Sequence, residues 1–235
     1  MSFNAVILAG GLGTRLREAV PDLPKVLAPV NGRPFLCYVL DRLADAGCST
    51  AVLAVGYGRD VVRSVIGARH GSVAIKYSEE QTPLGTGGAA AHAAKFVSTA
   101  DVVVLNGDTF AEVDYCTMLA AHRAAVARVT VAVKWVDDVA RFGAVDLVGD
   151  RIVRFKEKGE RGPGLINAGV YVFDTTLLAS LDDRNEAFSL ETDVLHRRTP
   201  ELTPLAFITT GRFVDIGVPD DYRTAWLMLQ DTKEK

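Results

Sequence analysis

The first half of the chain alternates short apolar runs with segments of helical periodicity, and this alternation restricts the fold more than any other feature. Apolar runs at residues 4–9, 50–56 and 73–77 have the length and composition of buried strands. Between them, residues 35–46 place apolar side chains on one helical face, and residues 60–67 form a shorter helical segment. This β-α-β-α-β order predicts a parallel sheet with right-handed crossovers.

The rest of the chain continues the alternation and then changes character. Further elements are expected as a loop leading into an alanine-rich helix over residues 78–97, a strand over 101–108, a helix over 115–125, a strand over 129–136, a hairpin around Gly149 and Asp150, strands over 167–173 and 204–209, and helices over 175–181, 190–198 and 219–230. The strands after residue 136 look shorter and more polar, which predicts a mixed sheet or a lobe on the edge of the first half. We expect one domain over residues 1–235, with a Rossmann-like α/β fold whose mixed, mostly parallel sheet is flanked by helices.

Composition and charge exclude several classes of protein. The chain has 235 residues, of which 49% are hydrophobic, and its net charge of -3 gives no basic field for nucleic acid or for an anionic membrane surface. Its cysteines, Cys37, Cys48 and Cys116, show no C-x-x-C spacing, which predicts reduced thiols in the core rather than a metal cage. Without a basic n-region or an apolar run of about 18 residues, the sequence predicts a soluble cytoplasmic protein.

A glycine-rich segment follows the first apolar run directly. Gly10, Gly11 and Gly13 carry no side chain, so backbone N–H groups there can approach a phosphate closely. Arg15 and Lys25 then add charge that backbone groups cannot supply. A glycine-rich turn alone is a weak signal, but the strand before it and the two cations after it favour a phosphate-binding loop.

A second glycine-rich segment imitates a dinucleotide fingerprint. The Walker pattern is absent, but Gly85, Gly87 and Ala90 satisfy G-x-G-x-x-A, a helix follows, and Asp108 lies eighteen residues further on. Residues 78–84 separate these glycines from the preceding strand, whereas the fingerprint needs the strand to run directly into the first glycine. A dinucleotide-dependent oxidoreductase therefore stays open as an alternative.

Two aspartates are candidates for a metal site. Asp108 ends an apolar strand, where open α/β sheets place their ligand groups, and Asp215 stands between an apolar pair and a glycine. Two carboxylates together with substrate phosphates are a usual way to hold Mg²⁺. The histidines share no metal-ligand spacing, so we expect surface or packing positions for all of them, namely His70, His92, His122 and His196.

Eight short motifs occur in the order seen in one enzyme family. They are AGGLGTRL, LPK, PLGTGGA, LNGD, FGAVDL, FKEKG, INAGVYVF and FVDIGVP, and together they span nearly the whole chain. On these motifs the chain resembles the sugar-1-phosphate nucleotidylyltransferases. The phrases APVNGRPF, PLGTGGA and INAGVYVF most resemble the members that act as guanylyltransferases on D-glycero-α-D-manno-heptose 1-phosphate in bacterial surface-polysaccharide synthesis, including capsule.

The resemblance implies a role for each matching residue. Residues expected to bind the nucleotide are Leu8, Ala9, Gly10, Gly11, Gly13, Thr14, Gln81, Pro83, Leu84, Gly85 and Gly88. Residues expected to bind the sugar and its phosphate are Asn106, Gly143, Glu157, Lys158 and Asn167. The resemblance assigns catalysis to Arg15, Lys25 and Asp108, and Mg²⁺ binding to Asp108 and Asp215. The nucleotide-binding half would end near residue 135, and the sugar-binding half would follow it.

Three functions are compatible with these residues. The first is transfer of a nucleotidyl group from an NTP, with GTP expected, to a sugar 1-phosphate, with the heptose expected and mannose or glucose as alternatives. The second is a non-catalytic regulatory protein that binds nucleotide sugars, and the third is the oxidoreductase. Val26 stands where the family often has proline, a change that affects the stiffness of its loop more than the Lys25 cation. Gly159 also stands at a frequent proline position, which predicts a more flexible loop after Glu157. Expected partners are the NTP and the sugar 1-phosphate, not nucleic acid or membrane, and a homodimer is left open.

Overall fold

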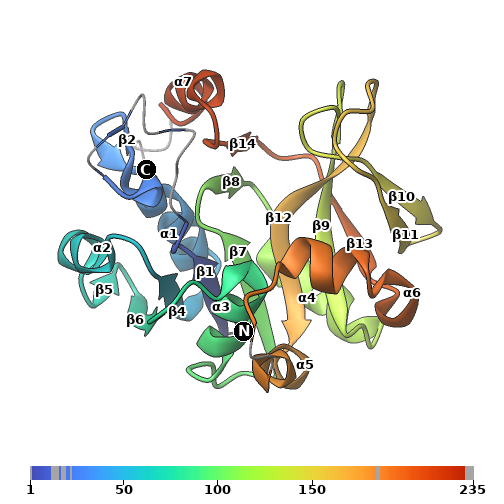
Figure 1. Ribbon diagram of the computed structural model, residues 1–235, viewed down its shortest axis with the longest axis horizontal. Coiled ribbons are helices and arrows are strands. Elements are labelled where there is room, and N and C mark those ends of the chain that lie inside the picture. Colours follow the sequence, from blue (N-terminus) through green and yellow to red (C-terminus); the bar gives the residue numbers. More distant parts are fainter. Residues whose placement is uncertain (1, 12–15, 17–19, 22, 184–185, 231–235) are drawn as a thin grey trace.

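The computed structural model describes residues 2–11, 16, 20–21, 23–183 and 186–230, with strand β1 (Phe3–Leu8) at the centre of its first half (Figure 1). The other strands of this half are β4 (Cys48–Val55), β5 (Arg69–His70), β6 (Val73–Glu79) and β7 (Asp101–Asn106). β1 runs parallel to its neighbours β4 and β7, and β4 runs parallel to β6. The parallel sheet expected from the alternating pattern is confirmed.

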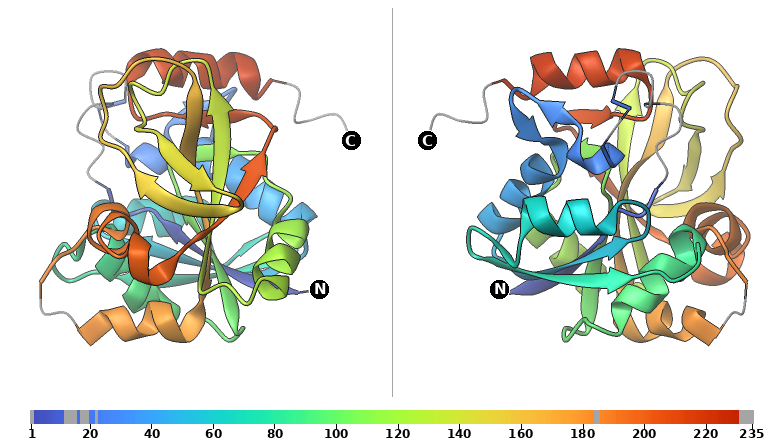
Figure 2. Two further views of the ribbon diagram at one scale, coloured as in Figure 1. Left: turned by 90° about the vertical axis from the view of Figure 1, so that its right-hand side faces the viewer. Right: turned by 60° about the vertical axis from the view of Figure 1, so that its left-hand side comes forward.

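Helices form a layer on each face of the sheet (Figure 2). One layer contains α1 (Phe35–Asp45), α2 (Arg59–Ile66), α4 (Tyr115–Ala124) and α7 (Pro219–Met228). The other contains α3 (Gly85–Ala94), α5 (Thr175–Ala179), the short η2 (Ser180–Asp183), the π-helix η3 (Leu190–His196) and α6 (Thr199–Leu202). Alternate residues of β7 enter the two cores, with Val103 in the first and Val104 in the second. Strands covered on both faces are apolar throughout, which explains their uniform sequence runs.

The second half of the chain extends the same sheet instead of forming a separate lobe. Its strands are β9 (Val129–Val136), β10 (Val145–Val148), β11 (Arg151–Phe155), β12 (Gly164–Asp174) and β13 (Leu205–Thr209). β12 lies antiparallel between β7 and β9 and so joins the two halves. It has 11 residues, most of them buried, so the prediction of shorter and more polar strands is wrong for β12, which is covered on both faces. The hairpin expected around Gly149 is formed by β10 and β11.

Within the described residues, the large sheet has ten strands in the order β10-β11-β13-β9-β12-β7-β1-β4-β6-β5. β5, β11 and β12 run against the direction of β1, and the other strands of the sheet run with it. The mixed, mostly parallel sheet flanked by helices is therefore confirmed.

Several short elements carry no periodic signal in the sequence and were not expected. They are η1 (Lys25–Leu27), β2 (Pro29–Val30), β3 (Arg33–Pro34), β8 (Thr109–Ala111) and β14 (Phe213–Asp215). Elements this short are below the length at which periodicity can be recognised. One of them matters for the site, because β14 pairs with β8 and sets Asp215 opposite Thr109, next to Asp108.

The cysteines are free thiols in three different environments. Cys48 is buried in β4, and burial raises the pKa of its thiol to about 12. Cys37 is half-buried, and burial raises its pKa as well. Cys116 is exposed, so the prediction of core thiols is wrong for it, because α4 turns its other face, with Met118, toward the core. Among the described helices, none has the length and apolar character needed to cross a membrane.

Candidate active site

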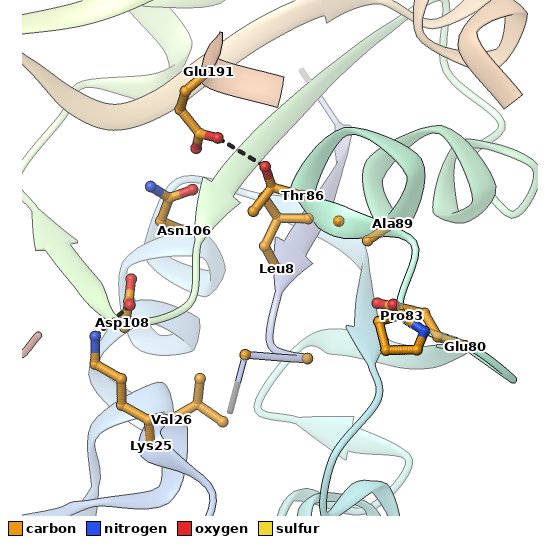
Figure 3. A pocket seen from close by; sticks show the side chains of 13 residues that line it. Leu8, Lys25, Val26, Glu80, Pro83, Thr86, Ala89, Asn106, Asp108 and Glu191 are labelled. Atoms are coloured by element: carbon orange, nitrogen blue, oxygen red, sulfur yellow. Dashed lines mark hydrogen bonds and ion pairs between the residues drawn. The ribbon is translucent and has the colours of Figure 1, made fainter. Parts of the chain in front are cut away.

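Two adjoining pockets lie beyond the carboxyl ends of the parallel strands. The first, of about 340 Å³, is lined by Leu8, Gly10, Gly11, Lys25, Val26, Glu80, Pro83, Gly85, Thr86, Ala89, Asn106, Asp108 and Glu191 (Figure 3). The second, of about 470 Å³, is lined by Asn106, Thr109, Phe142, Gly143, Ala144, Val145, Phe155, Lys156, Glu157, Lys158, Asn167, Ala168, Gly169, Tyr171, Glu191, Thr192, His196, Phe213 and Asp215. Asn106 and Glu191 line both, so the two pockets share a wall. Strand ends of this kind are the usual ligand position in open α/β sheets.

The floor of the first pocket is a close approach of the segments that follow β1, β4 and β6. The backbone N–H of Glu80 donates to the carbonyl oxygen of Val55 at 3.0 Å. A Cβ atom on Gly10 would lie 2.9 Å from Oε1 of Glu80 and 3.2 Å from the backbone nitrogen of Gly56. A side chain at position 10 would therefore displace the Glu80 carboxylate, which explains the need for glycine there.

The start of α3 forms one side of the first pocket. Gly85 has a φ of +72°, and a Cβ there would lie 2.3 Å from the carbonyl oxygen of Phe188. That carbonyl accepts the N–H of Gly87 at 2.9 Å, and Oε2 of Glu80 accepts the N–H of Leu84, also at 2.9 Å. The backbone can therefore pack tightly against the chain before η3, and the wall of the pocket is set by main-chain atoms.

Three charged side chains meet beside the shared wall. Nζ of Lys25, whose side chain is 11% exposed, lies 2.5 Å from Oδ2 of Asp108 and 3.8 Å from Oδ1 of Asp215. Burial, together with the neighbouring charge of Asp108, raises the pKa of the Asp215 carboxyl, and Lys25 and the N–H of Gly217 offset part of that rise. One lysine thus holds two carboxylates close together, one from each pocket.

The shared wall also holds polar atoms available to a ligand. Oδ1 of Asn106 is buried and has no hydrogen-bond partner among the described residues. Buried acceptors in native proteins are normally paired, so this atom indicates a donor supplied by a ligand or by water. Glu191 accepts a hydrogen bond from Oγ1 of Thr86 at 2.7 Å and one from Oγ of Ser189 at 3.1 Å, which ties η3 to the start of α3.

Aromatic rings form much of the second pocket. The rings of Phe155 and His196 stack with centroids 4.9 Å apart and an interplanar angle of 10°. Phe142 and Phe213 meet edge to face at 5.5 Å. Nearby, Gly143 has a φ of +81°, and a Cβ on it would lie 2.5 Å from the carbonyl oxygen of Lys156. Aromatic faces with a few polar groups suit a polyhydroxylated ring.

The structure brings together most of the residues singled out from the sequence. Those that line the first pocket are Leu8, Gly10, Gly11, Lys25, Pro83, Gly85 and Asp108. Those that line the second are Gly143, Glu157, Lys158, Asn167 and Asp215, and Asn106 lines both. Four of the predicted residues line neither pocket, namely Ala9, Gln81, Leu84 and Gly88. Ala9 is buried and Gln81 is exposed. Gly88 packs against Leu84, since a Cβ on Gly88 would lie 2.8 Å from the Leu84 side chain. Gly13, Thr14 and Arg15 fall outside the described residues.

Several other residues that line these pockets were not predicted from the sequence. Glu80, Thr86 and Glu191 line the first pocket, and Phe155 and His196 line the second. The Thr86–Glu191 contact joins positions 105 apart in the sequence, so no local motif contains both of them. His196 packs on Phe155, in keeping with the expectation of surface or packing positions for the histidines, and the π-helix also places it in a pocket wall, which the sequence did not indicate.

The structure explains the dinucleotide-like spacing by packing. A Cβ on Gly87 would lie 2.3 Å from the ring of Phe188, so this glycine and Gly85 allow α3 to contact the chain before η3. The loop before α3 separates it from β6, as the sequence indicated. The glycines are accounted for without a dinucleotide.

Among the described residues, the side chains placed to bind a metal ion in the site are the carboxylates of Asp108 and Asp215. Within the described residues there is no group of three or more His, Cys, Asp or Glu side chains arranged around one point. Asp108 and Asp215 are the carboxylates that meet beside Lys25. Such a pair fits a cation whose remaining ligands are substrate phosphates and water.

Comparison with known proteins gives consistent results. Residues 4–232 match the family model described as nucleotidyl transferase. The D-glycero-alpha-D-manno-heptose 1-phosphate guanylyltransferase of Aneurinibacillus thermoaerophilus is 39% identical over 97% of this chain and 98% of its own length. The protein of the same name from Campylobacter jejuni is 37% identical over 93% and 96%. The crystal structure of HddC from Yersinia pseudotuberculosis complexed with GMP-PN superposes with a TM-score of 0.84 at 34% identity, covering 97% of this chain and 100% of that one.

Proposed function

The chain belongs to the nucleotidyl transferase family, and we propose that it transfers the guanylyl group of GTP to D-glycero-α-D-manno-heptose 1-phosphate, giving GDP-heptose and pyrophosphate. Two relatives of that name match almost the whole chain at 39% and 37% identity. A related structure was solved with GMP-PN, which supports a guanine nucleotide.

The observation that carries the proposal is the shared wall of the two pockets, with Lys25 beside it. Asp108 lines the first pocket and Asp215 the second, and Lys25 contacts both. A reaction between two phosphates must bring two polyanions together and offset their repulsion. A buried cation between a nucleotide pocket and a sugar pocket meets this requirement.

The mechanism needs no general base. A sugar phosphate has a second pKa of about 6, so at neutral pH its oxygen is already ionised and can attack the α-phosphorus directly. The new bond joins that oxygen to the α-phosphorus, and the bond to the bridging oxygen of the β-phosphate breaks to release pyrophosphate. Lys25 stabilises negative charge on the transferring group, and the buried Oδ1 of Asn106 accepts a hydrogen bond from a substrate hydroxyl.

Mg²⁺ is part of the proposal. Asp108 and Asp215 fit it, because two carboxylates kept close by one lysine offer oxygen ligands while leaving other positions for phosphate oxygens. When bound, Mg²⁺ would neutralise charge on the phosphates.

The proposal extends to the cellular setting. The relatives' substrate suggests a role in the synthesis of a surface polysaccharide such as a capsule, in the cytoplasm where nucleotides are available. A homodimer is also proposed. Sedimentation analysis would test the oligomeric state.

The test is pyrophosphate release from each of the four NTPs combined with heptose, mannose and glucose 1-phosphates, with and without Mg²⁺. Release that depends on GTP, on the heptose phosphate and on Mg²⁺ supports the proposal in full. Release with another pair keeps the reaction and corrects the substrates. Folded protein that releases no pyrophosphate with any pair would favour the regulatory alternative, which binding of GDP-sugars by calorimetry would then test.

A further inference from the structure

His196 occupies a position in the second pocket that packing alone does not require. Its ring stacks on Phe155 through one face, and it lines the pocket beside Thr192 and Glu191. Stacking uses the face of the ring and leaves the two edge nitrogens free. Neither ring nitrogen makes a hydrogen bond within the part of the chain that the structure describes.

Burial favours the neutral form of the His196 imidazole. Burial lowers its pKa, and the carboxylates of Glu157 and Glu191 oppose this only in part. A neutral imidazole presents one N–H donor and one acceptor nitrogen. This combination matches a sugar hydroxyl, which also donates and accepts, and it does not match a phosphate, which needs donors and positive charge.

The π-helix fixes where His196 lies along the second pocket. Hydrogen bonds in a π-helix join residues five apart, as between the N–H of Arg197 and the carbonyl oxygen of Thr192. Glu191 and His196 are also five apart, so their side chains lie on one face, one turn from each other. Glu191 lines both pockets, whereas His196 lines the second pocket alone, one turn farther from the shared wall.

The β10–β11 hairpin brings the stack to the pocket. Phe155 pairs with Val145, and the neighbouring Ala144 bridges Ile166 of β12, so the hairpin lies against the strand that carries Asn167. The Phe155–His196 stack therefore forms one wall of the second pocket. With the sugar phosphate held beside Lys25 and Asp215, the hydroxyls that reach this wall are those remote from C1, on C3, on C4 or on the arm carried by C5.

We propose that His196 recognises the terminal hydroxyls of the exocyclic arm and so selects a heptose 1-phosphate over the corresponding hexose. This inference rests on the proposed function. D-glycero-α-D-manno-heptose and mannose share the same ring and differ by one CHOH unit in the arm, so the added hydroxyl is what a specific residue must contact. Phe155 acts as a positioning residue that fixes the plane of the imidazole.

Two substitutions separate hydrogen bonding from packing. His196→Phe keeps an aromatic ring for Phe155 but removes both nitrogens, and His196→Gln keeps a donor and an acceptor without the ring. The control is His70→Phe, at a histidine on β5 that pairs with Asp41 and lines neither pocket. The experiment measures kcat/KM with GTP for heptose 1-phosphate and for mannose 1-phosphate, with melting temperatures to verify folding.

The preference of the enzyme for heptose 1-phosphate is the decisive readout. We expect His196→Phe to lower the kcat/KM ratio of heptose to mannose about 5- to 10-fold, the size of one neutral hydrogen bond, and His196→Gln to restore part of it. A general packing defect would lower both values together and leave the ratio unchanged, which would overturn the inference. An unchanged ratio in a well-folded, active variant overturns the inference alone. A wild-type protein that uses neither sugar overturns the proposed function as well.

Discussion

The two pockets are built differently although they share Asn106 and Glu191. The first is formed where parallel strands end and α3 begins, so neighbours in the sheet supply it. The second is lined by β12, the β10–β11 hairpin, β14 and the π-helix of the second half, together with Asn106 and Thr109 of the first half. Main-chain atoms shape the first pocket, and side chains, many of them aromatic, shape the second. Sheet topology thus positions the first pocket, whereas loops and short elements position much of the second.

Lys25 lines the first pocket and contacts Asp215 of the second, and its loss should have the largest effect on activity. We expect Lys25→Ala to lower kcat about 100- to 1,000-fold, the usual cost of one preorganised group that stabilises transition-state charge. The steady-state rate of pyrophosphate release measures kcat. Lys95→Ala is the control, because Lys95 makes an exposed ion pair with Asp182. Equal activity of both variants and wild type would remove Lys25 from the chemistry.

A matched pair of glycines tests whether the pockets are independent. Gly85 and Gly143 both have positive φ, and a Cβ on either would lie within 2.5 Å of a backbone carbonyl oxygen. We expect Gly85→Ala to raise the KM for GTP and Gly143→Ala to raise the KM for the sugar phosphate. Each should also lower the free energy of unfolding by about 1–3 kcal/mol from backbone strain.

The control for both glycines is Gly149→Ala. Gly149 also has a positive φ, of +60°, but no atom lies within 4 Å of its Cβ position, and it lines neither pocket. The Gly149→Ala variant should be less stable than wild type and should keep the wild-type KM values for GTP and for the sugar phosphate. If Gly85→Ala and Gly143→Ala change the same KM, the separation of the two pockets is wrong.

Loss of the hydrogen bond between Thr86 and Glu191, which links the two pockets, should have a smaller effect on activity. Oγ1 of Thr86 donates to Glu191 and accepts the N–H of Leu190, at 2.7 and 2.9 Å. Thr86→Val should cost about 1 kcal/mol of stability and raise both KM values, since Glu191 lines both pockets. Thr117→Val removes a comparable bond to Asp114 on α4 and should change stability without either KM. A change confined to one KM would show that Glu191 serves one pocket alone.

The same difference between the regions explains what the sequence can reveal. Strands buried on both faces leave apolar runs in the sequence, so the strands were predictable. Gly10 was predictable because it directly follows such a run, and Lys25 because it lies in the short motif LPK. Asp215 was a candidate, but its position beside Asp108 depends on the pairing of β14 with β8, which three residues cannot signal. His196 required the π-helix, whose five-residue spacing has no recognisable pattern.

Substitution of Glu80, which lines the first pocket, should have the smallest effect on stability. Burial raises the pKa of its carboxyl, and the N–H of Leu84 and the charge of His92 lower it in part. A carboxyl whose pKa is higher in the folded than in the unfolded chain adds stability at low pH and loses that contribution as the pH rises through the folded pKa. Glu80→Gln keeps an acceptor for Leu84 without the charge, so we expect it to melt slightly above wild type at neutral pH.

The pH dependence of that difference identifies its cause. As the pH falls and the carboxyl becomes protonated, the melting temperatures of wild type and Glu80→Gln should converge. Glu79→Gln is the control, because it removes an exposed pair with Arg63, worth about 0–1 kcal/mol, and should melt at or below wild type. A lower melting temperature for Glu80→Gln at neutral pH would mean that the charge stabilises this wall, and the first pocket would then depend on side-chain electrostatics as much as the second.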